Sequence, residues 1–207
     1  MENLETASAV DVCSATIIRP VSLNDIVSAK GRFLVKIIDK YGNLREEDFI
    51  DNVITDVGAQ FMLDQCFGGA QNTAYFLGLI SSVGYTGIPV VGDTMSSHAS
   101  SNHVWVEAGN GSNYPNWSTP ASNARGTCAW SAAAARAKAL SSALSFVIAT
   151  NGGTVKGSFI VTGPGAVATN NSTAGVLFSA GVFSNGDKVL GVGDTLQVSY
   201  SATINAA

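Results

Sequence analysis

Charged residues are scarce in this chain of 207 residues. Only 13% of its residues are Asp, Glu, Lys or Arg, whereas an ordinary soluble domain has roughly 25%. The scarcity is uneven, because residues 1–50 hold fourteen of the charged side chains, and between Asp64 and Arg125 only Asp93 and Glu107 are charged. A monomer normally keeps a charged surface to stay soluble. The pattern therefore predicts a chain that packs against copies of itself or against another protein.

Other absences exclude further classes of protein. A net charge of −4 without a basic stripe argues against a nucleic-acid partner, because phosphates need clustered Lys and Arg. No apolar run approaches the roughly 18 residues of a membrane span, so no membrane partner is expected. The acidic N-terminus lacks the basic start and apolar middle of a secretory signal, so the chain is expected to mature where it is made, in a cytoplasm.

Groups that carry chemistry are also few. Cys13, Cys66 and Cys128 are widely spaced without a CxxC pair, so free and mostly buried thiols are expected. His98 and His103 lie five residues apart, not at the spacing that places two ligands on one helix face.

Two carboxylates remain as candidates for acid and base catalysis. Asp93 and Glu107 are a conceivable glycosidase-like pair, but nothing in the sequence fixes the distance between them. We therefore expect no enzyme activity, no catalytic residues, no cofactor and no metal.

Glycine-rich turns divide the chain into short apolar runs, which is typical of many short strands. Residues 130–144 are alanine-rich and fit a helix or extended structure equally well. The pattern predicts an all-β, β-sandwich or jelly-roll-like domain with one short helix. The expected elements are a hairpin over 31–38 and 44–50, a helix over 55–66, a strand over 74–80 that is either buried on both faces or at an interface, a long polar loop over 82–124, a hairpin over 144–150 and 154–162, and strands over 175–183, 188–190 and 195–204.

The first thirty residues differ from the rest. Arg19-Pro20 separates two apolar clusters, and neither cluster continues with the period of a helix or a strand. Proline fixes its own φ and biases the residue before it towards extended geometry. Residues 1–30 therefore form either an extended N-terminal arm, the reading adopted here, or a first strand. Residues 31–207 form the β domain.

Apolar residues fall into predicted core and contact sets. The predicted core is Phe33, Val35, Ile37, Phe159, Val161, Phe178, Val182, Val198 and Tyr200. The residues predicted to contact a partner protein or a second copy are Ile17, Ile18, Val21, Trp105, Tyr114 and Trp117.

Several motifs follow one another along the chain. They are Gly31-Arg32-Phe33, Asp51-Asn52-Val53-Ile54, Thr55-Asp56-Val57-Gly58, Leu77 to Val83, Gly92 to His98, Trp105 with Glu107, Arg125 with Trp130, Gly153 to Ile160, Leu177 to Phe183 and Gly193 to Tyr200. Taken in this order, they resemble a family of small β-rich structural proteins of tailed double-stranded DNA bacteriophages. The similarity covers roughly residues 31–205, and residues 1–30 are longer than the start of that family.

This resemblance implies a virion component, and a capsid cement or decoration protein is the role we expect from it. Its partners would be the major capsid protein and further copies of itself, as a dimer or a trimer, on the capsid surface. The alternative is a tail or fibre-tip protein that binds host surface glycans through the loop over 82–124, with Tyr114, Trp117, Trp105 and Trp130 as a stacking platform.

Overall fold

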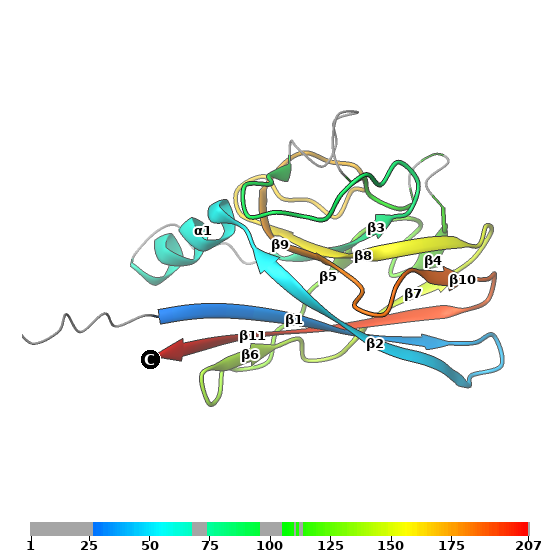
Figure 1. Ribbon diagram of the computed structural model, residues 1–207, viewed down its shortest axis with the longest axis horizontal. Helices are drawn as coiled ribbons and strands as arrows, with labels where there is room; N and C mark the ends of the chain where they lie inside the picture. Colours follow the sequence, from blue (N-terminus) through cyan, green and yellow to red (C-terminus); the bar gives the residue numbers. More distant parts are fainter. Residues whose placement is uncertain (1–26, 68–73, 96–104, 110, 112–113, 207) are drawn as a thin grey trace, which may run out of the picture.

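The chain folds into a curled antiparallel β-sheet with one short helix (Figure 1). The computed structural model describes residues 27–67, 74–95, 105–109, 111 and 114–206. The predicted mostly β class with one short helix is confirmed. The strands are β1 Val27–Ile38, β2 Leu44–Ile54, β3 Phe76–Ser81, β4 Trp117–Thr119, β5 Gly126–Thr127, β6 Ala137–Ala139, β7 Leu144–Ile148, β8 Gly153–Thr162, β9 Val176–Val182, β10 Lys188–Leu190 and β11 Thr195–Ala206.

One path of paired strands runs through the whole sheet, in the order β4-β7-β11-β1-β2-β9-β8-β3-β5. Strand β2 makes the bend, because it pairs with β1 over most of its length and with β9 only at Val53 and Ile54. The sheet therefore curls into a half-barrel whose two layers, β1-β2-β11 and β3-β8-β9, face each other in Figure 1. The end strands β4 and β5 are joined directly by residues 120–125.

Alternation along the strands places the main core inside the curl. Phe33, Val35 and Ile37 of β1 are almost fully buried, and the residues between them point outwards, as a period of two requires. On the neighbouring β11, Val198 and Tyr200 face the same interior. Of the nine predicted core residues, all are buried except Val182, which is half-buried.

A second core lies on the outer side of the β3-β8-β9 layer. Phe159 and Val161 of β8 pack there with Trp105 and Met95, which come from the long loop after β3. The burial of β3 on both faces, predicted from its unbroken apolar run, is thereby confirmed. The loop over 82–124 thus serves partly as a cover for its own sheet.

Helix α1, Asp56–Cys66, begins where the sequence predicted it. The Thr55 hydroxyl caps it by accepting a hydrogen bond from the Gly58 amide at 3.0 Å, a role that Ser, Thr and Asp fill best. Gly58 lies directly against β9, where an added Cβ would come within 2.3 Å of the Phe178 carbonyl oxygen.

Three sequence predictions need correction or completion. Strands β7 and β8 do not form a hairpin, because β7 pairs with β11 and β4 whereas β8 pairs with β3, β9 and β10. Gly152 and Gly153 instead allow the chain to pass close to two other segments. A Cβ on Gly152 would lie 2.5 Å from the backbone of Leu190, and a Cβ on Gly153 would lie 2.7 Å from the backbone of Pro115.

The ambiguous stretch 130–144 is extended, with β6 paired to β11 and a bridge between Trp130 and Leu140. At the start of the domain, Val27 to Lys30 belong to β1 and pair with β11. The domain boundary predicted at residue 31 therefore moves to Val27 or earlier, and residues 1–26 of the predicted arm lie outside the described residues.

We predict that Gly58→Ala lowers the free energy of unfolding by about 1–3 kcal/mol, because the new methyl group collides with the backbone of β9. Gly92→Ala is the matched control, since no atom lies within 4 Å of its added Cβ, and a change within about 0.5 kcal/mol is expected. Urea unfolding measures both values. Equal stability of the two variants would contradict the close approach of α1 and β9.

Candidate functional site

The most buried polar feature of the described chain is an ion pair between Arg125 and Glu107. Both side chains are fully buried, and the guanidinium donates to both carboxylate oxygens at 2.9 and 2.8 Å. Such bidentate pairs are the strongest hydrogen-bonded ion pairs in proteins. Arg125 also donates to the carbonyls of Val167 and Ser172, and the Asn171 amide donates to Glu107. The pair thus fastens the loop between β8 and β9 to the segment around Glu107.

Asp93 has a similar role nearer the start of the same long loop. It is 6% exposed and accepts hydrogen bonds from the Trp105 indole and the Val90 amide, both at 3.1 Å. The two carboxylates considered for acid and base catalysis are therefore engaged with different internal partners. Neither is presented as half of a catalytic pair in the described structure.

A second charged cluster surrounds Lys188 on β10. Its ammonium group contacts Asp48 at 2.7 Å and also pairs with Glu46. Burial acts to raise the pKa of Asp48, but hydrogen bonds from Lys188 and from the Phe49 and Asn185 amides outweigh it and lower that pKa from 3.8. Burial acts to lower the pKa of Lys188, but the hydrogen bonds to both carboxylates outweigh it and raise that pKa from 10.5. Each charge therefore stabilises the other.

The predicted contact residues fall into three groups. Trp105 and Trp117 are 0% and 1% exposed and lie inside this chain, so their place is in its cores rather than on a surface that a partner reaches. Tyr114 is 39% exposed and remains available. Ile17, Ile18 and Val21 lie outside the described residues.

The stacking platform considered for glycans is not assembled from these rings. Besides the two buried tryptophans, Trp130 is half-buried and packs edge-on against Tyr75 and Tyr200. Tyr114 alone of the four presents a largely open side chain. The prediction of a glycan-binding tail protein thus gains no supporting geometry from these four side chains.

Of the cysteines and histidines, only Cys66 and Cys128 lie in the described parts of the chain. Cys128 is buried, and burial raises its pKa to about 12; Cys66 is exposed rather than buried as expected. Both described thiols are free, and Cys13, His98 and His103 lie outside the described residues. Within the described ranges, no three His, Cys, Asp or Glu side chains gather as metal ligands.

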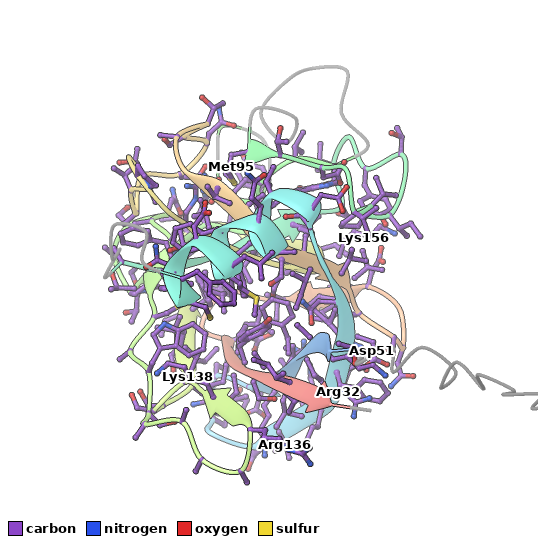
Figure 2. The ribbon with its side chains drawn as sticks, turned by 90° about the vertical axis from the view of Figure 1, so that its left-hand side faces the viewer. Arg32, Asp51, Met95, Arg136, Lys138 and Lys156 are labelled. Carbon is purple, nitrogen blue, oxygen red and sulfur yellow. The ribbon has the colours of Figure 1, made fainter. Side chains whose placement is uncertain are left out.

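An apolar pocket opens at one end of the curl. Its volume is about 310 Å³, and its walls come from β1, β11, α1 and the turn around β6. Tyr75, Trp130 and Phe178 form its inner wall, while Arg136 and Lys138 lie at its edge. Figure 2 looks towards this end, with α1 across the opening and the segment carrying Arg136 and Lys138 below it.

Sequence reasoning missed the pairing of Arg125 with Glu107 and the pocket. The pairing had a partial signal in the few charges of this stretch, because a charged residue that becomes buried is almost always paired. The pocket had none, since its walls come from six separate parts of the chain. No helix among the described residues has the length and apolar character needed to cross a membrane. Comparison with models of known protein families, with curated proteins and with solved structures finds no match to this chain.

We predict that Arg125→Met destabilises the fold by about 3–5 kcal/mol, because it leaves the Glu107 carboxylate buried without its cation. The control is Arg32→Met, which removes an exposed arginine paired with Asp51 and should cost about 1 kcal/mol or less. Chemical denaturation gives both values. Similar losses for the two variants would contradict the structural role of the buried pair.

We also predict that Asp48 contributes to the loss of stability in acid. Its folded pKa lies below 3.8, so its contribution is present above the unfolded pKa of about 4 and is lost as the pH falls through the folded value. Asp48→Asn should therefore lower stability at neutral pH and make the loss of stability below about pH 4 shallower. Asp51→Asn, at an exposed pair, is the control. An unchanged acid profile in Asp48→Asn would refute the assignment.

Proposed function

We propose that this chain is a structural protein of a bacteriophage virion, a capsid cement or decoration protein that bridges major capsid subunits and stabilises the shell. The observation that carries the proposal is an uncharged surface on the loop after β3. Asp93 and Glu107 are the only charged residues between Asp64 and Arg125, and both are buried. The described surface of that stretch therefore carries no charge.

Apolar side chains project from this surface. Val83, Ile88, Val90 and Val91 are 46%, 62%, 51% and 53% exposed. We call these four residues the loop face. Four exposed aliphatic side chains within nine residues fit a surface that another protein covers. One charged group lies beside them, because Lys156 of β8 packs over the Tyr85 ring.

The opposite layer has the character of a solvent-facing surface. Cross-strand ion pairs Arg32–Asp51 and Lys36–Glu47 lie on β1 and β2, and their side chains are about half exposed. Figure 2 places Arg32 and Asp51 in the lower half of the molecule, away from Met95 in its upper part. On this proposal the loop face meets the shell and the β1–β2 layer faces outwards.

The proposed mechanism is thermodynamic. Each Å² of apolar surface removed from water contributes about 25 cal/mol, and many copies on one shell repeat this gain. The two facing layers of the curled sheet also support the narrower fold class, a β-sandwich or jelly-roll-like domain, which we retain as part of the proposal. The proposal also includes self-association as a dimer or a trimer, in which the N-terminal arm bridges neighbouring copies.

The direct test is co-sedimentation of the purified chain with capsids from which it has been stripped. We expect saturable binding that weakens when residues 1–26 are deleted and that weakens about tenfold, or roughly 1.4 kcal/mol, in the double variant Ile88→Asp/Val90→Asp. The matched control is Val189→Asp, at a 66% exposed valine on β10. Circular dichroism checks that each variant is folded.

Absence of binding by the full-length chain would overturn the cement proposal. Equal binding by the loop variant and the control would remove the loop face from it. Binding that is unchanged by deletion of residues 1–26 would remove the arm.

A further inference from the structure

We propose that the apolar pocket at the end of the curl binds the segment Ala15–Ile18 from a second copy of this chain. The inference rests on the self-association contained in the proposed function. It names the receiving site, the inserted segment and the direction of exchange, none of which that function specifies.

The pocket lies where the chain enters the domain. Ala29 on β1 is one of its walls, two residues after the first described residue. The segment 1–26 therefore departs beside the pocket. At about 3.3 Å per extended residue, the nine residues from Ile18 to Val27 span up to about 30 Å, which is enough to reach an adjacent molecule.

The chemistry of the segment fits the pocket. Ala15-Thr16-Ile17-Ile18 is aliphatic apart from one hydroxyl and carries no charge. The walls it would meet include Tyr75, Trp130 and Phe178. A cavity of about 310 Å³ has room for a few aliphatic side chains, and their burial removes apolar surface from water on both sides.

Charge at the pocket edge complements charge at the start of the chain. Arg136 and Lys138 lie on the edge, and neither forms an ion pair with an acid among the described residues. Residues 1–14 contain Glu2, Glu5 and Asp11 and no basic residue. The segment is flanked by Asp11 on one side and by Arg19, directly after Ile18, on the other. Insertion with the Ala15 end towards Arg136 and Lys138 would bring Asp11 to the two cations and keep Arg19 on the far side, which favours this direction of entry.

The geometry of β1 favours a second copy over the same chain. Val27 is paired with Ala206 at the very end of the β1–β11 ladder, so the strand leads out of the domain. Return of Ile17 and Ile18 to their own pocket requires a full reversal between residues 19 and 26. Insertion into a neighbour requires none, and reciprocal insertion gives the self-complementary contact of a two-fold dimer.

The test is complementation between two full-length variants in sedimentation equilibrium. Ala133→Asp places a charge at the pocket lining, and Ala132→Asp is its matched control on the neighbouring exposed alanine, which does not line the pocket. Ile17→Asp/Ile18→Asp alters the segment, and Val10→Asp/Val12→Asp is its control. Circular dichroism establishes that all four variants are folded.

We expect the unaltered chain and both controls to associate, and the pocket and segment variants each to dissociate at least about tenfold more readily. Mixing the two defective variants should restore a heterodimer, because one supplies an intact segment and the other an intact pocket. A mixture that stays monomeric, a chain that is monomeric at every concentration, or association unaffected by either variant would overturn the proposal.

Capsid co-sedimentation of the same variants separates this inference from the proposed function. Capsid binding that persists without segment exchange would leave the cement role standing and refute only the exchange. Exchange in a chain that binds no capsid would refute the cement role and leave the pocket assignment standing.

Discussion

The buried ion pair between Arg125 and Glu107 is the interaction on which the loop side of the molecule depends. It joins the segment around Glu107 to the loop between β8 and β9, and both lie over the outer side of the β3-β8-β9 layer. Without this fastening, Trp105, Met95 and Phe159 would lose the cover that keeps them from water. Because removal of one partner leaves a buried charge uncompensated, the pair specifies one closed arrangement of these loops.

The same pair explains the unusual surface. The two charged side chains between Asp64 and Arg125 are buried: Glu107 pairs with Arg125, and Asp93 accepts a hydrogen bond from the Trp105 indole. The loop face therefore consists of apolar side chains. On β1 and β2, by contrast, the pairs Arg32–Asp51 and Lys36–Glu47 are exposed cross-strand ion pairs. One chain thus has a solvated layer and an uncharged loop surface, an asymmetry suited to a molecule with one side against an assembly.

Short-range sequence patterns correctly predicted those elements whose structure depends mainly on neighbouring residues. The β-branched and aromatic residues of 31–38 predicted a strand with Phe33, Val35 and Ile37 in the core, and the apolar positions of 55–66 predicted helix α1. The unbroken apolar run of β3 predicted burial on both faces, although which segments cover its outer side followed only from the structure.

Sequence patterns gave wrong or incomplete predictions where contacts with distant segments determine the structure. Asn151-Gly152-Gly153 has the composition of a hairpin turn, but its glycines serve the close approach of Leu190 and Pro115. Trp105 and Trp117 in a polar loop resembled contact residues until their burial placed them in the cores. The alanine-rich stretch 130–144 is extended because β11 and Leu140 provide pairing partners that no local propensity encodes.

In the proposed function the loop face meets the shell while the β1–β2 layer stays in solvent. This orientation can be tested by hydrogen–deuterium exchange of the chain, free and bound to stripped capsids. We expect new protection of backbone amides in residues 82–95 on binding, with little change in the turn at residues 39–43. Protection confined to the β1–β2 layer, with residues 82–95 exchanging as in the free chain, would contradict it.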